Sequence, residues 1–338
     1  MNSQPVSSES RNGGHDGAGE PERGQGPVVA AFDGSAGSGH ALEWALAEAR
    51  LRGAPLRIVH VRSYGIPFVD GPLTPPLREP STGDLVMDRV RTDLEGRAGL
   101  EGRTGLEARP DLPPLEYVTV DGSPGRELPR LGADAQLLVL GSRGRGGFAS
   151  LLLGSNGLAC AREAACPVVV VRGPSEGAAD SGAVGRCGGP RVVLGLSAPA
   201  PDAAAVAFAF AAAARRGARL QVIAAYPWPV LSSTPTGDFV VSAIEDEETR
   251  VDYASLGDEV LAPHRARWPD VPVDVFVVPG DAAGHLVDAS HDADLVVVGR
   301  HRRRVGPGRW LGSVTHAVLL HAGCSVGVVP PGPVPGAA

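Results

Sequence analysis

The segment that decides the fold runs from Leu137 to Ser155 and has the sequence LLVLGSRGRGGFASLLLGS. It opens on a short apolar run, and glycines follow at Gly141, Gly144 and Gly154. A continuous apolar run of this length, ended by glycine, is typical of a strand that is buried on both faces. The segment therefore predicts a buried strand, a glycine-rich loop and then a helix.

The same order recurs 158 residues later, where LVVVGRHRRRVGPGRWLGS occupies residues 295–313. The first and last glycines of the pattern are kept, as Gly299 and Gly312, but Arg302 replaces the middle glycine. Because strand, loop and helix keep one order in both halves, the sequence predicts two tandem copies of one domain. One copy keeps the glycine loop and the other has altered it.

Composition places the domain boundaries. Ser- and Gly-rich ends bury too little surface to offset the entropy of ordering, and a Gly/Ala/Pro stretch is typical of a linker. We expect a disordered tail over 1–26, a first domain over 27–173, a linker over 174–190, a second domain over 191–330 and a short tail over 331–338.

Apolar runs and helical periodicity predict the elements of each domain. In the first domain we expect strands over 28–32, 56–61, 115–120, 137–140 and 168–171, and helices over 38–52, 84–108, 124–131 and 155–164, the last capped by Ser155. In the second we expect strands over 192–196, 220–225, 273–278, 295–298 and 326–329, and helices over 203–216 and 313–321. Short apolar strands that alternate with helices indicate a parallel sheet covered on both faces.

The composition excludes several classes of protein. The chain has 338 residues, a formal net charge of −7 and no lysine, so that all 31 basic residues are arginine. An acidic chain repels phosphate backbones, which argues against general nucleic-acid binding. Walker A loops, protein kinases and pyridoxal enzymes each need a lysine, so all three are excluded.

The remaining residue types favour ordinary structural roles. The four cysteines include no C-x-x-C pair. The sequence also has no signal-peptide core and no apolar stretch long enough to cross a bilayer. We therefore expect a cytoplasmic protein. The cysteines are interpreted as buried hydrophobes, with redox sensing as the alternative. The scattered histidines predict no metal site. The basic loop of Arg300, His301, Arg302, Arg303, Arg304 and Arg309 is interpreted as solvated, with an anion or acidic-partner site as the alternative.

The glycine loop has the chemistry of a phosphate site. Gly141, Gly144 and Gly154 lack Cβ atoms, so backbone N–H groups can approach an anion closely. Ser155 opens a helix, whose N-terminus offers unpaired N–H groups and a positive dipole. Asp33 follows the first strand, and its carboxylate suits ribose hydroxyls or an adenine amine. In a doubly wound sheet these residues meet at the carboxyl ends of neighbouring strands; the simpler alternative is a flexible loop with an ordinary helix cap.

With Asp33 and the Gly141, Gly144, Gly154 and Ser155 set, the chain resembles the universal stress protein family in a tandem, two-domain form. The resemblance implies two doubly wound, five-stranded parallel sheets of strand order 3-2-1-4-5, an adenine-nucleotide alpha hydrolase-like fold, and ATP binding with or without Mg²⁺. Asp33 would meet the base and ribose and backbone near Val61 would meet adenine. Around ribose and phosphates the resemblance implies Gly141, Arg143, Gly144, Gly154, Ser155 and Asn156.

The second domain departs from this pattern, because Ser197 occupies the place of Asp33 and Arg302 that of Gly144. We therefore expect ATP in the first domain only, with slow or no hydrolysis and no catalytic residue, because no base stands at the phosphate end. The main hypothesis is an ATP-dependent regulatory or stress-response protein with an unknown protein partner. The alternatives are a nucleotide-independent scaffold, in which the fifth strands pair in an internal pseudo-dimer, and a slow ATPase; homodimerisation stays open.

Overall fold

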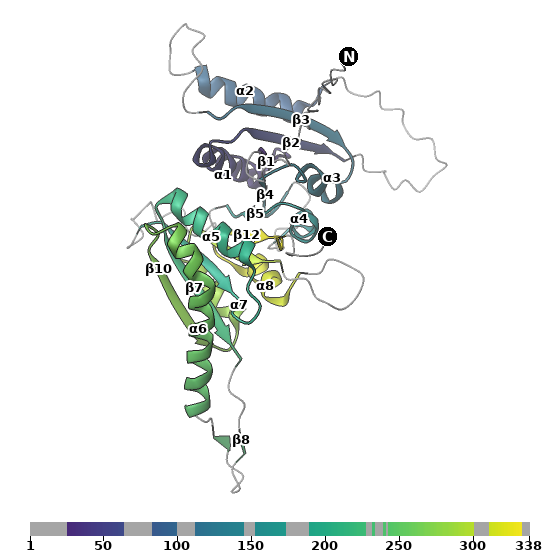
Figure 1. The fold of residues 1–338 in the computed structure, drawn as a ribbon. Helices are drawn as coiled ribbons and strands as arrows, with labels where there is room; N and C mark the ends of the chain where they lie inside the picture. Colours follow the sequence, from purple (N-terminus) through teal and green to yellow (C-terminus); the bar gives the residue numbers. More distant parts are fainter. Residues whose placement is uncertain are drawn as a thin grey trace, which may run out of the picture.

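The structure is a computed structural model that describes residues 26–63, 83–99, 112–144, 153–173, 189–227, 232–233, 239–240, 243–300 and 311–332. Strands and helices alternate along the chain (Figure 1). The first domain contains β1 (Val28–Ala31), α1 (Ala36–Arg52), β2 (Leu56–Arg62), α2 (Leu85–Gly99), β3 (Leu115–Asp121), α3 (Pro124–Leu131), β4 (Leu137–Gly141), α4 (Ser155–Glu163) and β5 (Val168–Val171).

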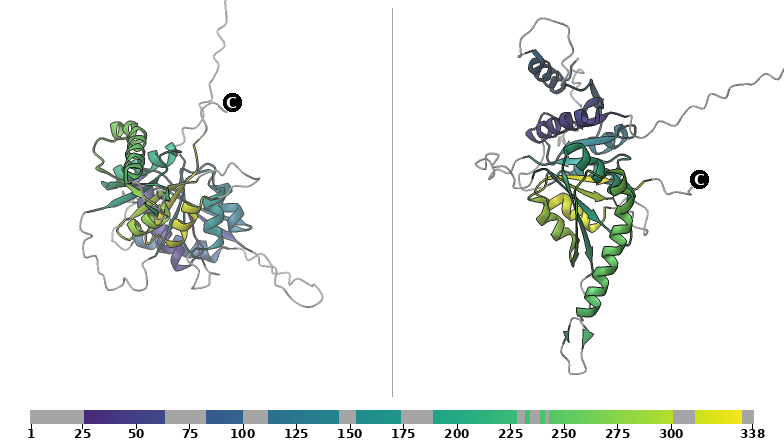
Figure 2. Two further views of the ribbon diagram at one scale, coloured as in Figure 1. Left: turned by 90° about the horizontal axis from the view of Figure 1, so that it is seen from below. Right: turned by 60° about the vertical axis from the view of Figure 1, so that its left-hand side comes forward.

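The second domain repeats this order and adds a small hairpin. It contains β6 (Arg191–Leu196), α5 (Ala203–Arg216), β7 (Arg219–Tyr226), the hairpin strands β8 (Ser232–Ser233) and β9 (Phe239–Val240), α6 (Ala243–Arg267), β10 (Val273–Pro279), α7 (Ala282–Ser290), β11 (Leu295–Gly299), α8 (Ser313–His321) and β12 (Ser325–Val329). Helices α6 and α7 were not among the elements expected from sequence. In Figure 2, α6 extends well beyond the end of the sheet, toward the β8–β9 hairpin.

All ten long strands form one sheet, in the order β10-β7-β6-β11-β12-β5-β4-β1-β2-β3. Within the first domain the order is 3-2-1-4-5 and the pairs are parallel, which confirms the predicted fold class, and the second domain has the same order. The two halves join where β5 pairs antiparallel with β12, from Val168 opposite Val328 to Val170 opposite Val326. The fifth strands therefore pair, as the pseudo-dimer hypothesis supposed.

Register fixes how the two domains correspond. Val28 lies opposite Leu137 in the first domain and Val192 lies opposite Leu295 in the second. The first strands are thus 164 positions apart and the fourth strands 158, so the second domain has six residues fewer between them. This difference falls between β2 and α2, and between β7 and α6.

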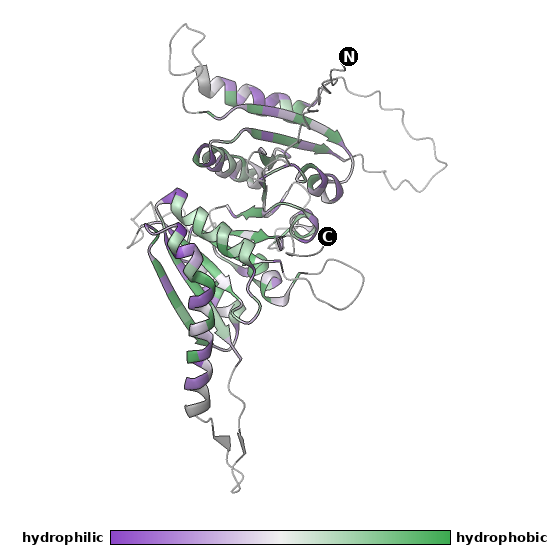
Figure 3. Cartoon of the chain, viewed as in Figure 1, coloured by the Kyte–Doolittle hydropathy of each residue, from purple (hydrophilic) through white to green (hydrophobic). Residues whose placement is uncertain are grey.

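Each face of the sheet has its own apolar core, and each core runs through both domains. Helices α1, α2, α5 and α6 cover one face, where Phe210 and Leu261 are fully buried. Helices α3, α4, α7 and α8 cover the other, where Leu286 and Leu319 are buried. In Figure 3 the strands are mostly hydrophobic, whereas α2 and α6 carry many hydrophilic residues. Burial on both faces explains why the strands are continuous apolar runs.

Helices α1 and α5 have well-defined ends. Ser35 caps α1 by accepting from the backbone N–H of Ser38 at 3.2 Å, and Asp202 caps α5 by accepting from Ala204 N at 3.1 Å. Both helices end on a left-handed glycine, Gly53 with φ 60° and Gly217 with φ 57°. The left-handed conformation is accessible to glycine at little cost, so both helices stop at these positions.

The same two helices hold the domains together through a buried charge cluster. Glu48 of α1 is 1% exposed and accepts from Arg52 Nε at 2.5 Å. From α5, Arg216 donates to Glu48, and the Arg215 guanidinium lies 3.6 Å from it. Although burial opposes the charged form, the three guanidinium groups hold the pKa of Glu48 below its ordinary value. This carboxylate therefore links the first domain to the second.

Two cation–π contacts cross the same boundary in opposite directions. Arg52 lies over the ring of Phe208 at 5.5 Å, and Arg216 lies over the ring of Trp44 at 5.3 Å. Trp44 also packs against the core. In both pairs the two residue types occupy equivalent helix positions, 164 residues apart, so the contact has the two-fold symmetry of a dimer interface.

Candidate functional site

A pocket opens at the carboxyl ends of β1 and β4, where the strand order of the first domain reverses. It encloses about 530 Å³, open solvent at the mouth included. The lining residues are Ala31, Phe32, Asp33, Ser38, Val59, Val61, Pro124, Leu128, Leu140, Gly141, Ser142, Arg143, Gly144, Gly154, Asn156 and Gly157. In open α/β sheets this switch point is where ligands bind.

Two backbone segments meet closely beside the pocket, and a glycine in each permits the approach. A Cβ on Gly141 would lie 2.6 Å from the carbonyl of Gly37, and a Cβ on Gly37 would lie 2.5 Å from the carbonyl oxygen of Arg143. Neither distance is compatible with a side chain, because the atoms that the added Cβ would meet belong to the backbone and cannot move aside as a flexible side chain could. The glycines at these two positions thus bring the loop after β4 onto the N-terminal turn of α1.

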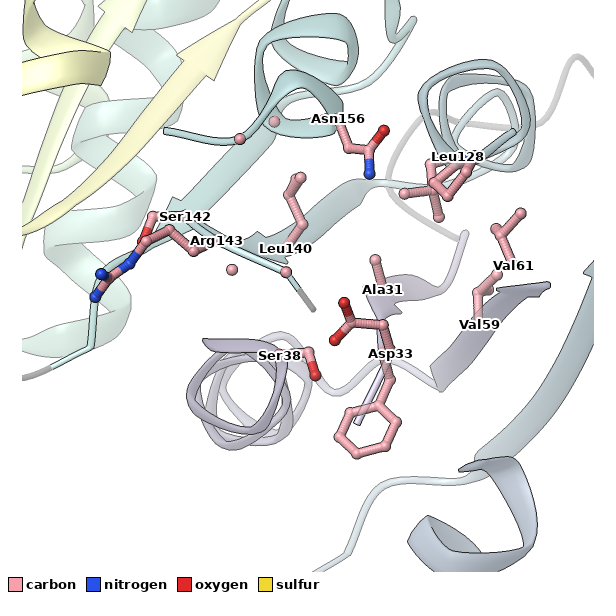
Figure 4. A pocket seen from close by; sticks show the side chains of 16 residues that line it. Ala31, Asp33, Ser38, Val59, Val61, Leu128, Leu140, Ser142, Arg143 and Asn156 are labelled. Carbon is pink, nitrogen blue, oxygen red and sulfur yellow. The ribbon is translucent and has the colours of Figure 1, made fainter. Parts of the chain in front are cut away.

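Asp33 provides the carboxylate of the site. It is partly buried just after β1, and its Oδ1 accepts from the backbone N–H of Ser35 at 2.9 Å. A Cβ on Gly144 would lie 2.7 Å from Asp33 Oδ2, so this carboxylate and the glycine loop are adjacent. Figure 4 shows the carboxylate among the lining residues of β1, β4 and α1.

One wall of the pocket is apolar. Val59 and Val61 project from β2 and Leu128 from α3, and these side chains are 1%, 9% and 4% exposed. Val61 is among the residues predicted from the sequence, whereas Leu128 is not. The signal for Leu128 was its place on the apolar face of the short helix that follows β3. An apolar wall and a carboxylate in one pocket suit a ligand in which a flat ring is joined to a group that bears hydroxyls.

Helix α4 closes the other side of the pocket with its N-terminus. Gly154 is the N-cap residue, and its N–H donates to the carbonyl of Ser142 at 2.8 Å. Asn156 and Gly157 line the pocket, while Ser155 is exposed and is not among the lining residues. The prediction that Ser155 caps this helix is wrong, because Ser155 is the first helical residue and the cap makes no side-chain hydrogen bond. Free backbone N–H groups still mark this helix end.

Arg143 lines the pocket, but its side chain is exposed and points away from Asp33 and Val61 (Figure 4). Ser38 and Ser142, which sequence analysis did not select, bring hydroxyl groups to the same cavity. Residues 145–152, between Gly144 and α4, lie outside the described residues. Among the residues that are described, no group of three histidine, cysteine, aspartate or glutamate side chains could hold a metal ion.

The equivalent place in the second domain differs in charge. Asp202, which corresponds to Ser38, lies against Gly299, the equivalent of Gly141: a Cβ on that glycine would lie 2.8 Å from Asp202 Oδ2. Ser197 occupies the position after β6 that Asp33 occupies after β1. The carboxylate near the glycine loop is therefore that of Asp33 in the first domain and that of Asp202 in the second. Arg302 and the rest of residues 301–310 lie outside the described residues.

Arg300 departs from the sequence-based expectation. It is 7% exposed, and its guanidinium Nη1 donates to backbone carbonyls of α4 and the residue after it. The interpretation of the basic loop as solvated is therefore wrong for Arg300. Sequence could not distinguish this arginine from its neighbours, because its partners lie more than 130 residues away in the other domain.

Two doubly wound domains, with a pocket at the switch point of the first, define a tandem α/β protein. The chain belongs to the universal stress protein family, whose model matches residues 26–172 and again 190–330. Across the described residues, helices are too short or too polar to cross a bilayer.

Relatives that align over most of both chains support the assignment. Universal stress protein Rv2005c of Mycobacterium tuberculosis is 33% identical over 292 residues, which is 86% of this chain and 92% of the relative. A universal stress protein of Mycolicibacterium smegmatis is 30% identical over 309 residues, 90% of this chain and 97% of the relative. A solved universal stress protein from Archaeoglobus fulgidus covers 92% of this chain and 98% of its own, with a TM-score of 0.55 and 17% identity. That last likeness concerns the fold.

Proposed function

We propose that the first domain, over 27–173, binds ATP and that the nucleotide regulates what the protein does. One observation carries the proposal: the Asp33 carboxylate, an apolar wall and the N-terminus of α4 surround one cavity at the switch point of the sheet. These are the three kinds of surface that a nucleoside phosphate requires. Hydrolysis is slow or absent. Mg²⁺ is present at the site only if the ATP phosphates bind it.

Each part of ATP has a matching surface. Val59, Val61 and Leu128 provide an apolar wall for adenine, and Asp33 is an acceptor for ribose hydroxyls. The phosphates lie toward the N-terminus of α4, where dipole and N–H groups favour anions. On this proposal the groups around ribose and phosphates are Gly141, Arg143, Gly144, Gly154, Ser155 and Asn156.

The second domain, over 191–330, is proposed not to bind ATP. Asp202 brings a carboxylate to Gly299, where it would repel a phosphate, and Ser197 lacks the acceptor charge of Asp33. Arg302 adds a long side chain at the position of the second loop glycine. The expected stoichiometry is therefore one ATP per chain.

A second candidate function is a nucleotide-independent scaffold. The β5–β12 pairing and the buried Glu48 cluster favour it, because they build an internal pseudo-dimer without any ligand. The two functions separate at Gly144, because a Gly144→Arg variant should lose ATP and leave a pure scaffold unaffected. A steady-state assay of phosphate release separates both from a slow ATPase.

Calorimetric titration of the full chain with ATP tests the proposal. We expect one site per chain, and an Asp33→Ala variant should bind about tenfold more weakly or worse, because hydrogen bonds to a charged acceptor are strong. Ser197→Ala, at the equivalent position of the second domain, is the matched control and should bind as the unaltered chain does. Two sites per chain, or an Asp33→Ala variant with unchanged affinity, would contradict the proposal.

A further inference from the structure

Arg300 belongs to the second domain but makes its side-chain contacts with the first. It follows β11 directly, and its backbone N–H donates to Val329 O at 2.7 Å, which fixes it at the end of β12. From there Nη1 lies 3.4 Å from Ala161 O, 3.0 Å from Arg162 O and 2.7 Å from Ala164 O. At 7% exposure this guanidinium is a buried cation that reaches across the domain boundary.

These three carbonyls lie at the C-terminal end of α4, where the last turn lacks partners within the helix. A cation there satisfies the carbonyls and complements the negative end of the helix dipole. The opposite end of α4 is the pocket, where Gly154, Asn156 and Gly157 are lining residues. Nine residues span about 14 Å, so one short helix connects the buried arginine to the pocket.

The position of the donor is specific to this half of the repeat. The position equivalent to Arg300 is Ser142 in the first domain, and Ser142 uses its carbonyl to accept from Gly154 within its own pocket. In the other direction Arg172 donates to Leu319 O at 2.7 Å and Leu320 O at 2.8 Å, at the C-terminal end of α8. Arg172 corresponds to Pro330, so the two crossings arise from different positions.

We propose that Arg300 is a positioning residue for the nucleotide site of the first domain, supplied by the domain that has lost its own site. It fixes the far end of α4, so that the helix N-terminus is held in the orientation that receives the phosphates. If α4 shifted, the buried guanidinium would lose acceptors that water cannot replace, and this resists movement. The inference rests on the proposed nucleotide site and concerns how that site is kept in order.

The test compares ATP with adenosine, titrated into the full chain. Removal of Arg300 should weaken the phosphate part of binding and spare the nucleoside part. In an Arg300→Ala variant we expect the Kd for ATP to rise about fivefold or more, the range of ordinary coupling between sites, with the Kd for adenosine within about twofold. Arg300→Lys, which keeps the charge but not the planar fork, should lie between, and it also serves if the alanine variant does not fold.

Arg216→Ala is the matched control, because it too removes a cross-domain arginine but one that contacts α1 instead of α4. Its ratio of ATP to adenosine affinity should equal that of the unaltered chain. The inference is overturned if Arg300→Ala leaves ATP binding unchanged, weakens both ligands equally, or matches Arg216→Ala. If the unaltered chain binds neither ligand, the proposed function has failed instead.

Amide hydrogen exchange then tests whether Arg300 holds α4 in place. Residues 155–158 should exchange faster in Arg300→Ala than in Arg216→Ala, and equal rates in the two variants overturn the inference.

Discussion

Gly144 and Asp33 are adjacent in the lining of the pocket, so that a Cβ on Gly144 would lie 2.7 Å from Asp33 Oδ2. The absence of a side chain at Gly144 is what allows the carboxylate its position. The second domain changes both members of this pair, to Arg302 and Ser197. A change at one position without the other should therefore disturb the site.

Gly144→Ala should weaken ATP binding, because the new methyl group displaces the Asp33 carboxylate from its place beside the loop. Gly144→Arg, which copies the second domain, should abolish it. Calorimetry measures both. Gly96→Ala is the control, since apart from its chain neighbours and the backbone of its own helix no atom lies within 4 Å of the Cβ that it adds to α2. Wild-type affinity in Gly144→Arg would exclude the loop from the binding site.

Glu48→Gln should destabilise the whole chain. The substitution leaves Arg52, Arg215 and Arg216 around an uncharged amide in a buried place, and breaking a buried ion pair costs about 3–5 kcal/mol. Urea unfolding, followed by circular dichroism, measures the loss. The exposed carboxylate of Glu116, paired with Arg57, provides the comparison: Glu116→Gln should cost less than about 1 kcal/mol. Equal losses would show that the cluster contributes no more than a surface pair.

The same cluster makes stability depend on pH. Burial opposes the charged form, but the neighbouring guanidinium groups lower the pKa of Glu48 from its ordinary value of 4.5. The Glu48 carboxylate therefore binds a proton more weakly in the folded state than in the unfolded state. Its contribution is therefore complete above about pH 5 and is lost as pH falls below 4.5 toward the lowered value. The free energy of unfolding of Glu48→Gln should fall less steeply in this range than that of the unaltered chain.

Asp84→Ala should release α2 from the sheet. Asp84 accepts from the backbone N–H of Met87 at 3.2 Å, from Thr119 Oγ1 at 2.7 Å and lies 2.6 Å from His60 Nδ1. Loss of a helix cap costs about 1 kcal/mol, so amides over 85–99 should exchange several-fold faster. Asp88→Ala, in the first turn of the same helix, should have little effect. Similar exchange in the two variants would mean that Asp84 does not anchor the helix.

The buried thiols should resist modification, which separates a structural role from redox sensing. Burial is the main cause that raises the pKa of Cys160 and of Cys166, each to about 12. A Cys187→Ser variant keeps three thiols, those of Cys160, Cys166 and Cys324. Ellman's reagent at pH 8 should label the folded variant very slowly, and it should label all three thiols once the variant is unfolded in urea. Rapid labelling of Cys160 or Cys166 in the folded chain would favour a redox role.

The sequence predicted the strands and most of the helices because burial on both faces gives apolar runs. The predicted bounds for α3, β5, α5 and α8 agree with the structure. Helices α6 and α7 were overlooked, although the repeat itself carried the signal: Leu85 and Pro124, which begin α2 and α3, lie 158 positions before the first residues of α6 and α7. The polar sequence of α6 and the shortness of α7 hid helices that the repeat would have located.

The pocket was predictable in part. Glycine spacing and the residue after the first strand led to Gly141, Gly144 and Asp33, because local sequence requires glycine where backbones meet. The apolar wall at Leu128 and the buried Arg300 were not predictable in this way, since both depend on packing between elements distant in sequence. Domain boundaries and binding roles remain predictions.

The antiparallel contact between β5 and β12 has a consequence for assembly. Each of these strands would be an open sheet border in a single domain, ready to accept another molecule, and here each is occupied by its covalent neighbour. In the part of the chain that the structure describes, the edge strands of this sheet are β3 and β10. A further copy that added strands would therefore have to lengthen the sheet from those outer ends, since the middle is already taken.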